Sequence, residues 1–333
     1  MKKSSVIIPT LLILQIVFIL IAGCKKPNNP IKYALGTFPD SVYNLKGLNT
    51  QYDDYNSNLY ILSSTIPIIF SSNRGSNGGQ FDLVQGSISY NFDQTTGAFT
   101  LESKMTSDAF LTSLLSSANT TGNDLGPLTL FSVADGYDYL MIASQNGGQM
   151  LDLYYLKYQP QFNNSMPAVL GPYSIKLLNS VSNDAYITFN ENEDSAYFTS
   201  DRNGNYDIFL QKRPAGTNLT KWFNQDYSAS TLVDSVNSSY DDKCPFVCKN
   251  VMIFTSNRPG GLGGYDLYYS VFKNGNWNSP VNLGPRFNTA SDEYRPVMGY
   301  DQEFKNLFIV FSSNKPGGNG GFDLYFTGFP IPK

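Results

Sequence analysis

A glycine-rich loop recurs along this sequence and limits the possible folds more than any other feature. Residues 254–270, FTSNRPGGLGGYDLYYS, place four glycines and a proline between two aromatic segments that read as β-strands. Residues 70–84, 198–210 and 311–327 repeat the order of aromatic residue, Ser or Thr, Ser, Asn or Asp, basic residue, glycines, aromatic residue and Asp. Residues 142–156 hold a degenerate copy without the basic residue. Five copies of one pattern predict a repeat architecture.

The last aspartate of each copy sets the period of the repeat. These motif aspartates are Asp82, Asp152, Asp207, Asp266 and Asp323, separated by 70, 55, 59 and 57 residues. With its upstream half, a unit reads strand, turn, strand, glycine loop and strand, and a fourth strand leads into the next unit. Four short antiparallel strands per unit are typical of a propeller blade. We therefore expect an all-β fold, a five-bladed β-propeller of four-stranded antiparallel blades.

The two ends of the repeat region complement each other. The last unit stops at DLYFTGFP without a fourth strand, whereas residues 36–45, GTFPDSVYNL, read as a fourth strand with no unit of its own. An N-terminal strand that completes the last blade would close the ring and remove exposed sheet edges. This closure predicts a propeller over residues 36–333.

The first spacing is longer than the others and predicts an insertion at about residues 86–122. Residues 86–104 read as a hairpin that turns at QTTG, and residues 107–122 place apolar side chains at helical spacing. Ser107 or Asp108 is the expected helix cap. The helix either packs on its own blade, which is the usual role of such a stripe, or forms a lid or partner contact.

The N-terminus has the pattern of a lipoprotein signal peptide. Lys2 and Lys3 precede an apolar run, and the run ends in Ile21-Ala22-Gly23-Cys24, which resembles the bacterial lipobox. We expect a signal peptide in residues 1–23 and a lipidated Cys24 followed by a flexible spacer to residue 35. The partner would then be a membrane, bound through acyl chains. The expected location is the outer membrane, facing the periplasm, with surface exposure as the alternative; an uncleaved transmembrane anchor is disfavoured by the short run.

Composition excludes several classes of function. The net charge of −4 and the pI near 4.9 argue against a nucleic-acid partner, which needs a basic surface. The chain has no histidine, so histidine general bases, Ser-His-Asp triads and histidine-ligated zinc are excluded. Cys244 and Cys248 would lie about 13 Å apart along a strand at about 3.3 Å per residue, so we expect separate thiols rather than a disulfide.

The segments SNRPGGLGGYDLY and SDRNGNYDIF resemble the WD40-like repeats of the translocation protein TolB and of many envelope proteins of Bacteroidetes-type bacteria. The resemblance covers nearly the whole mature chain. It implies a propeller that acts as an envelope scaffold or partner-binding module, and it carries no catalytic residues to transfer. It therefore favours a non-enzymatic protein with an envelope-protein partner.

Structural roles explain most polar residues of the motif. Glycines allow positive φ in tight turns, and the basic residues Arg74, Arg202 and Arg258 could each pair with a nearby acid in the loop. Gly-rich loops with Asp and Asn could also bind calcium, but calcium needs six or more oxygen ligands and each copy supplies few carboxylates. We therefore expect no metal and no cofactor.

A second set of acids keeps a carbohydrate-active alternative open. Asp54, Asp184, Asp242 and Glu293 occupy matching positions just before the expected innermost strands, so they could converge on the central tunnel or each cap its own turn. Paired carboxylates are what glycosidases use, and five-bladed propellers host such enzymes. A glycan is thus the alternative partner. Exposure of both Trp222 and Trp277 on the acidic face would favour it.

Overall fold

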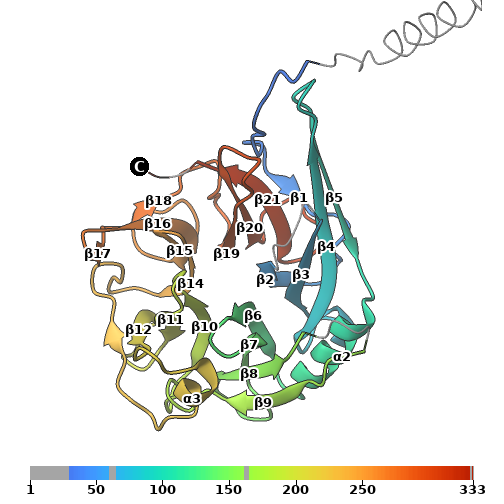
Figure 1. Ribbon diagram of the computed structural model, residues 1–333. Coiled ribbons are helices and arrows are strands. Elements are labelled where there is room, and N and C mark those ends of the chain that lie inside the picture. The colour runs from blue at the N-terminus through green and yellow to red at the C-terminus, as the bar shows by residue number, and fades with distance from the viewer. Residues whose placement is uncertain (1–29, 60–64, 161–164, 331, 333) are drawn as a thin grey trace, which may run out of the picture.

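The computed structural model describes residues 30–59, 65–160, 165–330 and 332, and these form a five-bladed β-propeller (Figure 1). Five antiparallel sheets surround a central axis, as the repeat predicts. Blade 1 contains β2 (Asp54–Leu59), β3 (Thr65–Ser72), β4 (Asp82–Phe92) and β5 (Phe99–Met105). Blade 2 contains β6 (Asp124–Ser132), β7 (Tyr137–Ser144), β8 (Asp152–Tyr158) and β9 (Leu170–Ser174).

The other three blades follow the same order from the axis outward. Blade 3 contains β10 (Asp184–Phe189), β11 (Ser195–Ser200), β12 (Asp207–Lys212) and β13 (Thr231–Leu232). Blade 4 contains β14 (Asp242–Cys248), β15 (Val251–Ser256), β16 (Asp266–Lys273), β17 (Asn276–Trp277) and β18 (Val281–Asn282), the last two both paired with β16. Blade 5 contains β19 (Glu293–Gly299), β20 (Leu307–Ser313), β21 (Asp323–Phe329) and β1 (Tyr43–Asn44).

The ring closes through the N-terminal strand, as the sequence predicts. Tyr43 pairs with Phe326 and Asn44 with Tyr325, so β1 is the outer strand of the last blade. Upstream of β1, the side chain of Phe38 is fully buried and stacks on Phe304 with ring centroids 3.9 Å apart. The first and last blades are thus joined by backbone pairing and by apolar packing.

The insertion extends blade 1 rather than forming a separate lid. The strands β4 and β5 make a long hairpin, and the turn between them contains residues 94–97, the QTTG predicted for it. Helix α2 (Ala109–Ala118) follows, and its cap is Asp108, whose carboxylate accepts a hydrogen bond of 2.8 Å from the Leu111 backbone N–H. Leu114, Leu115 and Ala118 are buried against the sheets, so the helix packs on its own core. A further short helix, α3 (Leu219–Phe223), and one 3-10 turn, η1 (Arg74–Ser76), lie in loops.

Two sequence predictions concern other parts of the chain. The signal peptide, Cys24 and the first part of the spacer lie outside the described residues. Cys244 and Cys248 are free thiols on the single strand β14, as expected, and Cys244 is buried. Within the described ranges, the structure contains no helix long and apolar enough to cross a membrane.

Candidate functional site

The predicted tunnel carboxylates are held within their own blades. Asp54, Asp184, Asp242 and Glu293 are each 0% exposed. Each accepts hydrogen bonds from the backbone N–H and the hydroxyl of a Ser or Thr four residues upstream; for Asp184 this is Ser180, at 2.6 and 2.9 Å. The structure therefore does not gather these acids into an open ring. They cap the turns that lead into the innermost strands.

The motif arginines pair with these same acids. Arg202 Nη2 lies 2.5 Å from Asp184 Oδ1 and also donates to the Leu178 carbonyl at 2.8 Å. Arg74 contacts Asp54, and Arg258 contacts Asp242, in the same way. Each arginine thus ties the glycine loop of its blade to the start of the innermost strand. The partner acid comes from the upstream half of the unit, a pairing that the motif alone did not identify.

The motif aspartates support the glycine loops from the other side. Asp266 accepts backbone N–H groups of Leu262 and Gly263 at 2.6 and 3.0 Å, and Asp323 accepts that of Asn319 at 2.6 Å. Asp82 and Asp207 accept side-chain amides of Gln80 and Asn205. Burial raises the pKa of Asp152 and raises that of Asp207 to about 6. Among the described residues, no three Cys, Asp or Glu side chains gather closely enough to hold a metal ion.

The axis itself is closed by residues that sequence reasoning missed. The third residue of every innermost strand has a positive φ, where the strand pairing is interrupted by a bulge. These axial residues are Asn56, Gly126, Tyr186, Cys244 and Arg295, with φ of 54, 56, 56, 57 and 42°. A Cβ on Gly126 would lie 2.5 Å from the Tyr186 ring, so glycine is required there. Each lies two residues after a capping acid, which for Gly126 is Asp124, and this shared position was the signal in the sequence.

The end of the propeller that carries the glycine loops, called the loop end below, has an aromatic rim. The residue before each motif aspartate is Phe81, Leu151, Tyr206, Tyr265 or Phe322, and all five are half-buried. The Lys243 ammonium lies 4.5 Å from the ring centroids of both Tyr206 and Tyr265. Since Lys243 is only 8% exposed, its ammonium group is enclosed by these rings.

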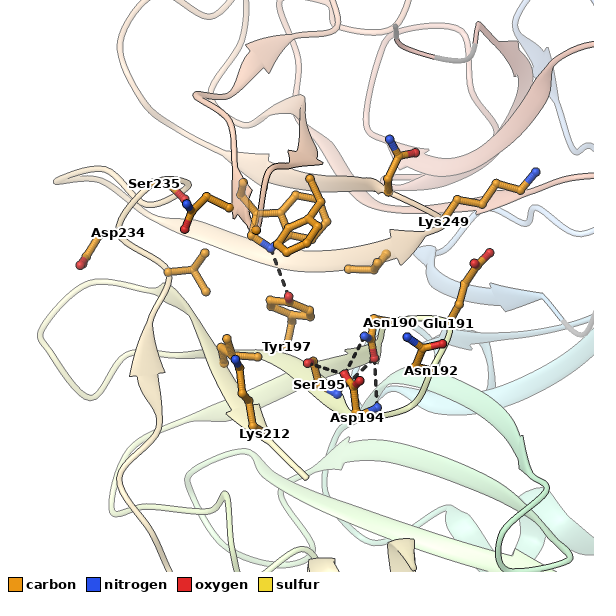
Figure 2. A pocket seen from close by; sticks show the side chains of 18 of the residues that line it. Asn190, Glu191, Asn192, Asp194, Ser195, Tyr197, Lys212, Asp234, Ser235 and Lys249 are labelled. Atoms are coloured by element: carbon orange, nitrogen blue, oxygen red, sulfur yellow. Dashed lines mark hydrogen bonds between the residues drawn. The ribbon is translucent and has the colours of Figure 1, made fainter. Parts of the chain in front are cut away.

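The opposite end holds a cleft between blades 3 and 4 (Figure 2). Its volume is about 970 Å³. The β10–β11 turn (residues 190–194), the β14–β15 turn (Lys249 and Asn250) and the β16–β17 turn contribute to its walls. Tyr197, Phe272 and Trp277 form an aromatic wall, with the Trp277 Nε1–H donating to the Tyr197 hydroxyl at 3.2 Å. The polar lining includes Asn, Ser, Lys and acidic side chains.

The cleft continues toward the axis. A second hollow of about 590 Å³, called the funnel below, is lined by the ends of β6, β10, β14 and β19. The cleft and the funnel share four lining residues, Asn190, Glu191, Val247 and Lys249. An extended ligand could therefore lie in the cleft and reach the axis.

The β10–β11 turn presents acids with opposite pKa shifts. Burial raises the pKa of Glu193, which lines the funnel and lies 3.6 Å from Arg213. Hydrogen bonds from Ser195 and Asn190 lower the pKa of Asp194, which lines the cleft; both are 2.7 Å long (Figure 2). Glu191 is exposed and lines both hollows. Acids with separated pKa values are what acid–base catalysis requires.

The two tryptophans do not form an exposed platform. Trp222 is 1% exposed and packs in the core, and Trp277 is 7% exposed at the wall of the cleft. Exposure of both tryptophans on an acidic face was expected for a sugar site, and the structure does not show it. In the cleft the exposed aromatic surface comes instead from Phe272, which is 41% exposed.

No family model matches the sequence, and no curated protein matches it either. Solved structures do match. An endo-arabinase from Bacteroides thetaiotaomicron is 13% identical with a TM-score of 0.53, covering 90% of this chain and 98% of its own. A thermostable family-43 glycoside hydrolase is 13% identical with a TM-score of 0.53, covering 84% and 90%. An α-L-arabinofuranosidase from Lactobacillus brevis is 9% identical with a TM-score of 0.51, covering 87% and 94%. At such identities the likeness establishes the fold.

These comparisons correct two sequence-based expectations. The sequence favoured a non-enzymatic scaffold of the TolB type, but the similar structures are glycoside hydrolases. The expectations of a scaffold role and of no enzymatic activity are therefore wrong on this comparison. The error arose because the residues of the repeat motif stabilise each blade and carry no information about a ligand site. The acids of the β10–β11 turn lie outside the motif and were not considered.

Proposed function

We propose that this protein is a carbohydrate-active propeller that binds a glycan in the cleft between blades 3 and 4 and cleaves it at the funnel. The observation that carries the proposal is the continuity of the two hollows at Asn190 and Glu191, beside acids whose pKa values are shifted in opposite directions. Propellers with similar folds include an endo-arabinase and an α-L-arabinofuranosidase, which supports the choice of ligand class.

The chemistry of the cleft suits a sugar chain. Sugars present apolar C–H faces and many hydroxyl groups, so their sites combine aromatic surfaces with a few polar groups that fix orientation. Phe272 offers the exposed aromatic surface, and Asn190, Asn192 and Asp194 offer hydrogen-bond donors and acceptors. A volume of about 970 Å³ is large enough for several sugar units, given that ligand pockets span about 300–1,000 Å³.

Hydrolysis of a glycosidic bond needs one protonated and one ionised carboxyl group. Glu193 is the proposed proton donor to the leaving oxygen, because its raised pKa keeps the proton available nearer neutral pH. Glu191 lines the same hollow and is the proposed second carboxyl group, acting on water or on the anomeric carbon. Asp194 stays ionised and is placed to accept hydrogen bonds from sugar hydroxyls in the cleft.

Assays on arabinan, arabino-oligosaccharides and xylo-oligosaccharides test the proposal. We expect new reducing ends with at least one of them, and we expect Glu193→Gln to lower the rate by about 10²–10⁴-fold while binding persists. Glu102→Gln is the matched control, because Glu102 is an exposed acid on the distant strand β5. Absence of both binding and cleavage across the panel would overturn the proposal. Equal losses in the two variants would remove Glu193 from the mechanism.

We further propose that the chain acts in the bacterial cell envelope as an outer-membrane lipoprotein. The lipobox-like residues 21–24 support lipidation at Cys24, and the glycine-loop motif supports kinship with WD40-like, TolB-type envelope repeats. Cys24→Ala should leave the propeller folded and release it from membranes, as measured by fractionation without detergent. Retention of the variant in the membrane fraction would contradict the lipid anchor.

A further inference from the structure

Arg295 occupies an unusual position at the centre of the propeller. It is the axial residue of β19 and is 0% exposed, although it is one of the largest side chains in the protein. Its guanidinium carbon lies 5.4 Å from the centroid of the Tyr186 ring, so the side chain extends across the axis to another axial residue. A fully buried arginine normally has a carboxylate partner.

Arg295 has no such partner among the described residues. Its Nη1 and Nη2 groups donate to the carbonyl oxygens of Pro245 and Pro127, each at 3.3 Å, which is long for a charged donor. Its Nε–H has no acceptor within the described part of the chain. The capping acid of the same blade, Glu293, is engaged instead by Thr289 and Ser313.

The ionisable groups around Arg295 do not supply a counter-charge at neutral pH. Its electrostatic neighbours are Cys244, Tyr186 and Tyr294. Burial raises the pKa of the Cys244 thiol to about 11 and raises the pKa values of both tyrosines well above their ordinary value. All three are therefore neutral at pH 7, and the guanidinium is a positive charge enclosed by neutral groups.

An isolated buried charge is among the most costly features that a folded protein can carry. The usual solutions are loss of the charge or a bound counter-ion, and a guanidinium does not lose its proton in proteins. From the axial position of Arg295, its complete burial and its unpartnered Nε–H, we propose that the propeller axis binds a small inorganic monoanion such as chloride. The site would hold the five innermost strands around one ion.

A second axial side chain supports an anion at this place. Asn56 has no donor for its Oδ1, while its Nδ2 lies 3.5 Å from the Tyr186 hydroxyl. Turning this amide by 180° lets Oδ1 accept from the Tyr186 hydroxyl and frees Nδ2 as a further donor. Arg295 and Asn56 then provide N–H donors from the adjacent strands β19 and β2, which contact each other. Donors from two strands and no carboxylate suit an anion and not a cation.

Thermal unfolding in different salts tests the site on the purified full chain. At constant ionic strength, replacing sodium gluconate with sodium chloride or bromide should raise Tm by about 2–4 °C, because a ligand that binds only the folded state stabilises it. Arg295→Met should abolish this halide-dependent shift. Arg286→Met is the matched control and should retain it, because Arg286 forms a surface pair with Asp40.

Crystallography covers the case in which Arg295→Met does not fold. In wild-type crystals grown in bromide, an anomalous peak should lie beside Arg295 Nε, in line with its N–H bond. Equal Tm values in all salts for the wild type would overturn the proposal. A halide shift that survives in Arg295→Met, or bromide peaks confined to the surface, would overturn it as well.

Discussion

Two gaps between neighbouring blades lie at the end of the propeller opposite the loop end, and they differ in one respect. Between blades 5 and 1 the N-terminal segment inserts Phe38, which stacks on Phe304 and contacts Phe308 and Tyr90 with ring centroids 5.0 and 5.2 Å away. Between blades 3 and 4 no such segment is present among the described residues, and the gap is the cleft of about 970 Å³. The first gap is filled at Phe38 and keeps only a smaller hollow of about 370 Å³ beside Tyr90 and Phe304, whereas the second holds the larger cleft.

Equivalent residues of β11 and β20 differ in the same way as the two gaps. The pairs Ser200 with Asp207 and Ser313 with Asp323 fix the alignment of β11 with β20. Five residues before these serines stand Ser195 at the cleft and Phe308 at the closed gap. A small polar residue thus lines the open gap where a large aromatic residue fills the closed one. The comparison teaches that the open cleft is set by departures from the repeat and not by the repeat itself.

Phe38→Ala should produce the largest effect, because it opens the closed gap. Truncation of a fully buried phenylalanine costs about 3–5 kcal/mol through lost transfer free energy and a residual cavity. Chemical denaturation should show this loss in the free energy of unfolding. Phe131→Ala is the control, since Phe131 is 45% exposed and its truncation should change stability by less than about 0.5 kcal/mol. Equal effects of the two substitutions would contradict the role of Phe38 in closure.

Arg258→Ala tests the loop end of the propeller. There the same arginine–aspartate pair recurs in blades 1, 3 and 4. Removing Arg258 leaves the buried carboxylate of Asp242 without its cation, and breaking such a pair costs about 3–5 kcal/mol. The arginine side chain is 15% exposed, so we expect a loss near the lower limit. Arg286→Ala removes a surface pair and should cost at most about 1 kcal/mol in the same denaturation experiment. Activity on glycans, measured below the unfolding transition, should be unchanged in both.

Ser195→Phe sharpens the comparison from the other side, by giving the cleft the aromatic residue of the closed gap. Because Ser195 lines the cleft, the ring should fill part of it and reduce glycan affinity at least about tenfold, with an overpacking cost of about 1–3 kcal/mol. Isothermal titration with the best substrate of the wild type measures the affinity. Ser195→Ala leaves the cleft open but removes the hydroxyl that hydrogen-bonds Asp194, so it should lose less affinity than Ser195→Phe and separates the effect of volume from that of the hydroxyl. Unchanged affinity of Ser195→Phe would place the glycan elsewhere.

The sequence predicted the fold well because the repeat encodes it directly. Five motif copies, an N-terminal strand to complete the last blade and the inserted hairpin and helix all follow from local patterns, and the structure has each of them. The proposed site was harder to predict because its acids lie in one turn, residues 190–194, that has no counterpart in the motif. The positions of Cys244 and Arg295 could not be predicted from the sequence either. They meet at the axis only because the ring brings equivalent positions together, which no single unit reveals.

The smallest predicted effect concerns Asp207, a motif aspartate in blade 3. Its pKa is raised by burial and by the nearby carboxylate of Asp242 to about 6, from an ordinary value of 3.8. The folded state therefore binds this proton more tightly than the unfolded state, so the stability that the proton adds is present at low pH and is lost as pH rises through 6. Relative to Asp207→Asn, the wild type should lose about 1 kcal/mol of unfolding free energy between pH 4 and pH 7, after allowance for solvent screening. Urea denaturation at a series of pH values measures the difference, and a constant gap between the two proteins would show that the carboxyl titrates alike in both states.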